Sequence, residues 1–130
     1  NMSKIVIAYI KARMKYNPNF ELIENPSGNI FDSIAGYNIL GVHGEMKDME
    51  KAIKDLSNMY GVTVDGVVAA HLHHHYSEDV RVKKFVSRCP SIIGIDDFAM
   101  SLSKGSNPGA MIIELTPGHG KTAEYFIDLT

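Results

Sequence analysis

The sequence predicts an α/β fold in which a β-α-β unit is followed by additional, mostly antiparallel strands. Two apolar segments, residues 37–44 and 65–71, flank a segment with a clear helical period, residues 45–60. After residue 76, apolar and polar residues alternate, which is typical of strands with one buried face. We expect a single domain over residues 1–130, because no linker or internal repeat interrupts the chain and about 100–150 residues is a common domain size.

The first predicted element is an amphipathic helix over residues 3–16, with Ser3 as its N-cap and the Asn17-Pro18 pair as its stop. The apolar residues of this segment stand at helical spacing: Ile7, Ile10 and Met14. Residues 19–25 then predict a short strand, which ends at the turn-forming sequence NPSGN.

The β-α-β unit spans residues 37–71. Its helix has one apolar stripe, made of Met49, Ala52, Ile53, Leu56 and Met59 or Tyr60. Gly61 follows where a helix C-cap belongs. Because such units connect parallel strands by a right-handed crossover, the strands at residues 37–44 and 65–71 should run parallel.

The remaining strands are predicted from alternation. Residues 80–88 predict one strand with an irregularity at the Lys83-Lys84 pair. Its inner face should carry Val80, Val82 and either Phe85 or Val86. Residues 91–95 and 110–115 predict further strands. The last strand, residues 122–129, pairs with the strand at 110–115 as a hairpin through the turn TPGHGK.

Composition excludes several classes of function. The net charge of -2 gives no general attraction to nucleic acid or to an anionic membrane. The apolar run at residues 5–10 is too short for a signal peptide, and no run approaches the roughly 20 residues that span a bilayer. The single cysteine, Cys89, cannot form an internal disulfide. We therefore expect a cytoplasmic protein with no membrane partner.

A phosphate-binding loop is also excluded. The sequence GHGKT, residues 118–122, matches the end of that motif, but Leu115 stands where a glycine is required. A helix should follow the threonine, whereas this sequence predicts a strand. His119 is therefore interpreted as a turn residue.

Three histidines stand at matching strand ends. His43 ends the first strand of the β-α-β unit, His71 ends the second, and His73 follows two residues later. Ligands bind at the carboxyl ends of neighbouring parallel strands, and imidazole is a common ligand of divalent metals. The pattern indicates a metal site; His74 and His75 are interpreted as loop residues. The alternative is that His71 hydrogen-bonds at the strand end and the others face solvent.

Residues for catalysis are harder to assign. Three histidines alone could form a single zinc site with an open position. Glu45, Asp96 and Asp97 are candidates for a general base only because they lie near turns. Cys89 has no partner base in the sequence, which argues against a nucleophilic cysteine. No catalytic residue is therefore assigned.

The order of these motifs resembles the C-terminal half of calcineurin-like metallophosphoesterases, phage and prophage members above all. The resemblance rests on a strand ending in GVHG, a helix, and a strand ending in AHLH. It implies the α/β/β/α sandwich of that family and hydrolysis of phosphate mono- or diesters by a metal-bound hydroxide. The family holds two ions of Mn, Fe or Zn. By this resemblance His43 and His71 would bind the second ion, and His73 would bind the first.

The sequence also departs from that family. Ala70 replaces a glycine, and the earlier motifs D-x-H, G-D-x-x-D and G-N-H are absent. We therefore expect the C-terminal portion of a phosphoesterase, holding at most one ion and inactive alone. The intact parent would act on a phosphate ester such as a nucleotide or nucleic acid.

Two alternatives remain, a non-catalytic α/β interaction module with vestigial histidines and a mononuclear three-histidine zinc hydrolase. Half of a two-sheet sandwich should also leave an apolar face uncovered, which favours a homodimer formed through the exposed sheet.

Overall fold

The computed structural model describes residues 2–25, 29–43, 48–70, 76–92 and 107–130. Its elements in chain order are α1 (Met2–Met14), β1 (Ile30–Ile34), β2 (Tyr37–His43), α2 (Met49–Tyr60), β3 (Gly66–Ala70), β4 (Tyr76–Arg81), β5 (Lys84–Arg88), β6 (Gly109–Thr116) and β7 (Gly120–Asp128). Within the described ranges, no helix has the length and apolar character needed to cross a membrane.

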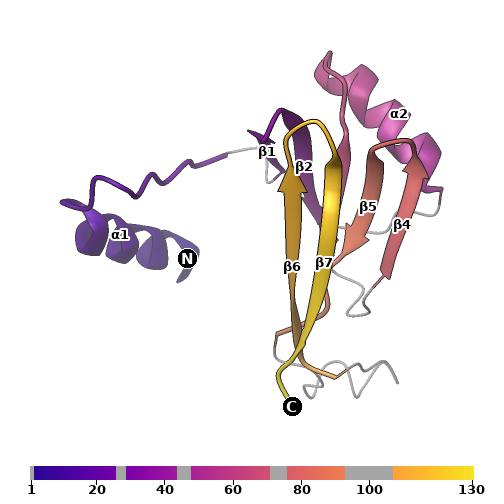
Figure 1. Cartoon of the computed structure of the whole chain (residues 1–130). Helices are drawn as coiled ribbons and strands as arrows, with labels where there is room; N and C mark the ends of the chain where they lie inside the picture. The colour runs from indigo at the N-terminus through magenta and orange to yellow at the C-terminus, as the bar shows by residue number, and fades with distance from the viewer. Residues whose placement is uncertain (1, 26–28, 44–47, 71–75, 93–106) are drawn as a thin grey trace.

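The strands form two sheets (Figure 1). Sheet A has the order β1-β2-β3-β5-β4, in which β2, β3 and β5 run parallel while β1 and β4 are antiparallel edge strands. Sheet B is the hairpin of β6 and β7, which lies across one face of sheet A in Figure 1. The predicted α/β class is confirmed, with its β-α-β unit and its C-terminal hairpin.

Helix α2 covers the other face of sheet A. Asp48 is its N-cap, because the side chain accepts a hydrogen bond of 3.0 Å from the backbone N–H of Lys51. Gly61 ends it in the left-handed conformation, with φ of 66°, as predicted. Ile53 of this helix packs into a cluster of buried residues from sheet A and from the loop between α2 and β3: Leu40, Val64, Val67 and Val86.

Strand alternation fixes which side chains face sheet B. Leu40, Val67 and Val86 are in register across three strands and pack under α2. The next residue on each strand points to the opposite face. One of these, Ser87 of β5, contacts Glu124 of β7. The face of sheet A opposite α2 therefore lies against sheet B.

The segment predicted as one irregular strand is two strands. β4 and β5 are antiparallel and joined at Val82 and Lys83, where Lys83 adopts a φ of 60°. The turn contains no glycine, proline or asparagine, so the usual signal of a reversal is absent. Val82, expected to face inward, is 89% exposed at this turn, whereas Phe85 and Val86 are both buried.

The N-terminal part differs from the prediction in two further ways. Residues 19–25 form no strand, and β1 forms instead after them. β1 joins β2 through Ala35 and Gly36, both with positive φ, which suits a two-residue hairpin turn. Most of the strand expected at 91–95 lies outside the described residues.

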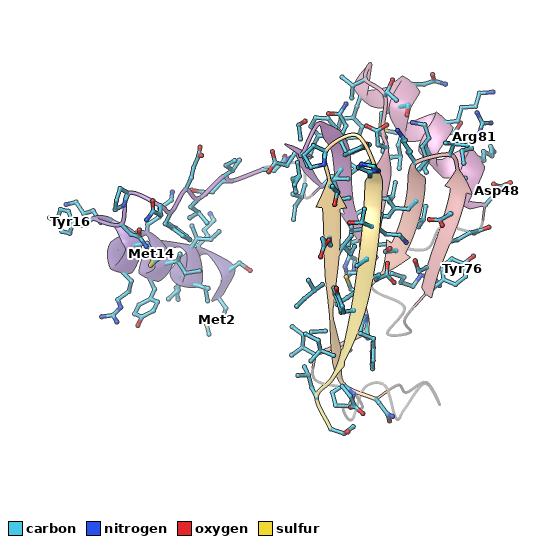
Figure 2. All side chains as sticks on the ribbon, in the orientation of Figure 1. Met2, Met14, Tyr16, Asp48, Tyr76 and Arg81 are labelled. Atoms are coloured by element: carbon cyan, nitrogen blue, oxygen red, sulfur yellow. The ribbon has the colours of Figure 1, made fainter. Side chains whose placement is uncertain are left out.

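Helix α1 begins at Met2, so Ser3 lies inside it and is not its N-cap. None of its residues is buried, and it lies apart from both sheets in Figures 1 and 2. Apolar side chains, including Met2, Ile5 and Tyr9, are therefore left exposed on this helix.

Candidate metal centre

The candidate site lies where β2 and β3 end. His43 is the last residue of β2 and is paired with Ala70, the last residue of β3, in a parallel register. The side chain of His43 is exposed. The residue that follows Ala70 in the sequence is His71. The two predicted strand ends therefore meet at one edge of sheet A.

The other predicted ligands, His71 and His73, lie outside the described residues, as do His74 and His75. So do the three carboxylates considered as bases: Glu45, Asp96 and Asp97. Within the described part of the chain, no group of three or more histidine, cysteine, aspartate or glutamate side chains is arranged to hold a metal ion. Of the three predicted ligands, His43 is the one that lies among the described residues.

A cavity of about 260 Å³ opens beside His43. It is lined by Ile30, Gly41, Val42, His43, Val68, Ala69, Ala70 and Cys89. Most of these residues are small or apolar. Among the described residues that line the cavity, His43 and Cys89 have side chains able to ligate a metal. The side chain of Ile30 lies over Gly41, where a Cβ would be 3.2 Å from Cβ of Ile30.

Cys89 directly follows β5. Its backbone N–H donates a hydrogen bond of 2.9 Å to the carbonyl oxygen of Ala69, which extends the pairing of β5 with β3 by one residue. Burial raises the pKa of the Cys89 thiol, and the negative charge of Glu124 raises it further. The sequence raised this residue only for a disulfide or as a nucleophile, and did not predict its position next to the candidate site.

A second polar cluster joins the two sheets near this site. Glu124 of β7 accepts hydrogen bonds from the hydroxyls of Ser87, at 2.6 Å, and Ser77, at 3.0 Å. Lys121 donates to Ser77 at 2.7 Å and to Glu124 at 3.3 Å. Ser87 is fully buried. No sequence signal predicted this cluster, because alternation in residues 122–129 places Glu124 opposite the apolar residues Ala123, Tyr125 and Ile127.

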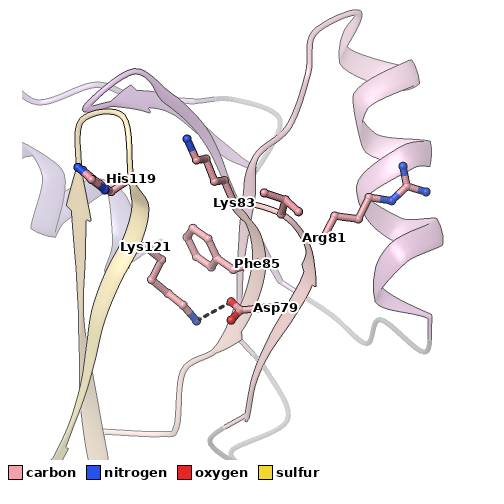
Figure 3. Close-up of a pocket in the computed structure, with 7 residues that line it drawn as sticks. Asp79, Arg81, Lys83, Phe85, His119 and Lys121 are labelled. Atoms are coloured by element: carbon pink, nitrogen blue, oxygen red, sulfur yellow. Dashed lines mark ion pairs between the residues drawn. The ribbon is translucent and has the colours of Figure 1, made fainter.

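His119 lies far from the candidate site, in the turn of sheet B. A separate cavity of about 350 Å³ lies between this turn and the β4–β5 turn (Figure 3). Within it Lys121 pairs with Asp79 at 3.7 Å, and Lys83 donates a hydrogen bond of 2.6 Å to the carbonyl oxygen of Gly118. Gly118 and His119 lie in the turn and β7 begins at Gly120, so the GHGKT sequence is part of a β-hairpin, as predicted.

Comparison with known proteins gives a relative in sequence and several structures of similar fold. No family model matches the chain. The chain is 26% identical over 130 residues to the uncharacterized protein YonJ, derived from the SPbeta prophage of Bacillus subtilis strain 168. That match covers 96% of this chain and 32% of the relative, so the chain spans about a third of the relative's length.

The similar structures are those of Vps29 from Entamoeba histolytica. Wild-type Vps29 complexed with Zn²⁺ has a TM-score of 0.56 and 16% identity, over 88% of this chain and 67% of that chain. A single mutant of Vps29 has a TM-score of 0.55 and 17% identity, over 86% of this chain and 66% of that chain. The chain has the calcineurin-like metallophosphoesterase fold. The predicted fold class is therefore correct, and the phage-derived relative agrees with the predicted type.

Within the metallophosphoesterase fold, the described residues leave part of the sandwich unmatched. About a third of the Vps29 chain has no counterpart in this one, and the earlier motifs of the family are absent from this sequence. The edge that carries His43 belongs to the part of the fold that this chain does contain.

Proposed function

We propose that this chain is the C-terminal portion of a metal-dependent phosphoesterase and supplies His43, His71 and His73 as metal ligands. The observation that carries the proposal is the pairing of His43 with Ala70 at the ends of two parallel strands. His71 is the residue that follows Ala70 in the sequence, so we assign it to the same site. The carboxyl ends of parallel strands are where ligands bind in open α/β sheets.

The neighbourhood of His43 suits a divalent ion. His43 is exposed and lines a cavity of about 260 Å³ together with Ala70. Imidazole nitrogen is a common ligand of Zn²⁺ and Fe²⁺ in proteins. A bound ion would lower the pKa of a coordinated water and polarise a phosphoryl oxygen. His43 would hold that ion from β2 and His71 would hold it from the segment after β3, while His73 matches the ligand of the family's other ion.

The chain alone should be inactive or weakly active. In the family it resembles, the first ligands come from D-x-H, G-D-x-x-D and G-N-H motifs, which this sequence lacks. Three imidazoles without those carboxylates can hold at most one ion in this chain. The match to about a third of YonJ and two thirds of Vps29 supports the proposal that the missing ligands belong to a longer protein.

Metal binding by the purified chain tests the ligand assignment. Calorimetric titration with Zn²⁺ or Mn²⁺ is expected to give about one ion per chain, and His43→Ala and His71→Ala should each weaken binding by tenfold or more. His119→Ala is the matched control, because His119 lies in the β6–β7 turn. Binding that is absent, or equally weakened by all three variants, would favour a non-catalytic module with vestigial histidines.

Turnover tests the second part of the proposal. The metal-loaded chain should not hydrolyse bis(p-nitrophenyl) phosphate above the rate of free metal ion, whereas a longer protein that includes the missing motifs should. Robust metal-dependent turnover by the 130-residue chain would support a self-sufficient three-histidine hydrolase instead.

We further propose that the isolated chain forms a homodimer through the outer face of sheet B. Ile112 of β6 and Tyr125 of β7 are cross-strand partners, and each is 53% exposed. Ile127 and Leu129 extend this apolar face along β7, and both are exposed. A second copy would remove these side chains from water, as residues of a longer parent would in the complete sandwich.

A further inference from the structure

We propose that helix α1 of one copy packs on the outer face of sheet B of a second copy, so that the homodimer forms by exchange of the two N-terminal helices. This inference rests on the proposed homodimer and goes beyond it, because it names the segment of the partner that covers sheet B. Three features of the chain carry it: two exposed apolar faces, the spacing of residues along them, and the short connection between α1 and sheet A.

One side of α1 is an exposed apolar stripe. Met2, Ile5 and Tyr9 are spaced by three and four residues, which places them on the same side of the helix. All three are exposed, Ile5 and Tyr9 by 63% each. The residues expected from the sequence to form the apolar side of this helix are half-buried: Ile7, Ile10 and Met14. A helix that is apolar around most of its circumference is typically covered by a partner.

The outer face of sheet B has an apolar centre of the same length. Ile112 and Tyr125 are cross-strand partners at this centre. The next pair on the same face is Ala110 with Ile127. In the other direction Glu114 is exposed and points to the face of Ile112, because side chains repeat every two residues along a strand. The face is therefore apolar at its centre and acidic at the end nearest the β6–β7 turn.

Spacing along the helix and the strand agrees. Four residues of an α-helix rise about 6 Å, and two residues of a strand span about 7 Å. When α1 lies along β6 with Tyr9 over Ile112, Arg13 therefore stands over Glu114. One turn in the other direction, Ile5 stands over Ala110. Each residue of the helical stripe then meets a residue of matching character on sheet B.

Charge favours the same arrangement. Helix α1 carries Lys4, Lys11 and Arg13, and it contains no aspartate or glutamate. Arg13 belongs to its last turn and lies on the side of Tyr9, four residues earlier. An arginine binds a carboxylate through two parallel N–H groups. A pair of Arg13 with Glu114 of the other copy would fix both the register and the direction of the helix on sheet B.

The connection to sheet A favours a second copy over the same chain. α1 lies apart from both sheets (Figures 1 and 2), and Lys11 pairs with Glu24, so residues 25–29 alone join this unit to β1. Five residues span at most about 18 Å. β1 is three strands from β5, or about 14 Å, and β7 lies over β5 at about 10 Å further out. The two offsets use nearly the whole span, whereas a second copy brings its sheet B to the helix.

Charge exchange between two variants tests the proposal. Arg13→Glu and Glu114→Arg should each weaken the dimer by about fivefold or more in dissociation constant, because like charges then meet at both contacts of the symmetric dimer. An equimolar mixture of the two variants should regain the affinity of the unaltered chain, since each helix meets an opposite charge on the other copy. Sedimentation velocity measures all three samples.

The mixture separates exchange from docking within one chain. If α1 packed on sheet B of its own chain, each variant would keep its like charges together, and the mixture would stay as weak as its components. That outcome would overturn the proposal. Lys4→Glu is the matched control, because it reverses a charge on the same helix but on a side away from Tyr9. It should leave the dissociation constant largely unchanged.

Apolar substitutions distinguish failure of this inference from failure of the proposed homodimer. Ile5→Ala combined with Tyr9→Ala should weaken the dimer by at least about tenfold. Neither residue is buried within its own chain, so the sheets should keep their fold, which circular dichroism checks. If substitutions on sheet B dissociate the dimer and those on α1 do not, the homodimer stands and α1 is not its occupant. A monomeric unaltered chain would overturn both. Metal titration of these variants should match the unaltered chain, because neither surface carries a proposed ligand.

Discussion

The carboxylate of Glu124 in β7 accepts a hydrogen bond of 2.6 Å from the hydroxyl of Ser87 in β5. Ser87 is fully buried, and the side chains of Lys121 and Glu124 are each 13% exposed. The contact therefore joins sheet B to sheet A through polar groups that are largely removed from water. A buried polar group that loses its partner keeps the cost of its desolvation.

Glu124→Gln should destabilise the fold by about 1–3 kcal/mol. It removes the carboxylate that accepts hydrogen bonds from the hydroxyls of Ser77 and Ser87 and from Lys121. Glu114→Gln is a matched control, since Glu114 is on the same hairpin but exposed, and it should change stability by less than about 0.5 kcal/mol. Urea denaturation followed by circular dichroism measures both. Equal effects would mean that the polar cluster does not hold the sheets together.

Gly66→Ala should destabilise the chain by about 1–3 kcal/mol through overpacking. A Cβ at this position would lie 2.5 Å from Cζ of Phe85 and 2.8 Å from Cδ1 of Ile39. Phe85 itself is buried and cannot move away freely. Combining Gly66→Ala with Phe85→Leu should recover part of the loss. A thermal unfolding cycle of the four proteins checks this, and strictly additive effects would contradict the clash.

Much of the fold could be predicted because local and tertiary signals agree. The helical stripe, the Gly61 cap and the two flanking apolar strands all specify one β-α-β unit. β1 was not predicted because all of its residues are exposed. A strand without a buried face need not alternate apolar and polar residues. The β4–β5 hairpin was missed because Lys83 adopts a positive φ in a turn without the usual residues.

The candidate site could be predicted only in part. The position of His43 followed from where an apolar strand ends, and the structure places it there. Cys89 comes forty-six residues later in the sequence, by the difference of the two residue numbers, and no local pattern links it to His43. Only the register of β2, β3 and β5 puts the two residues in one row. Spacing along the chain cannot supply that information.

Thiol reactivity should follow the environment of Cys89. Burial and the charge of Glu124 both raise the pKa of this thiol, so the reactive thiolate appears at higher pH than in a free cysteine. In the metal-free chain, the pH midpoint of iodoacetamide alkylation should therefore lie above that of the urea-unfolded chain. Glu124→Gln should lower the midpoint, because the repelling charge is removed. Coincident midpoints for the folded and unfolded chains would contradict this assignment.

Self-association should depend on the outer face of sheet B. Light scattering is expected to show dimers at high concentration, and Ile112→Ser combined with Tyr125→Ser should shift the population to monomer by at least tenfold in the dissociation constant. These two side chains are cross-strand neighbours and each is 53% exposed. Replacing both with serine removes the apolar side chains at the centre of this face. The two substitutions bury no new polar group and should leave the core intact.

Val82→Ser provides the control for this experiment. Val82 is 89% exposed and apolar, but it stands on the β4–β5 turn and outside sheet B. If exposed apolar area alone drove association, its loss would weaken the dimer as well. If sheet B is the interface, Val82→Ser leaves the dissociation constant unchanged. A monomeric unaltered chain at millimolar concentration would contradict the dimer, because two copies would then leave the outer face of sheet B in water.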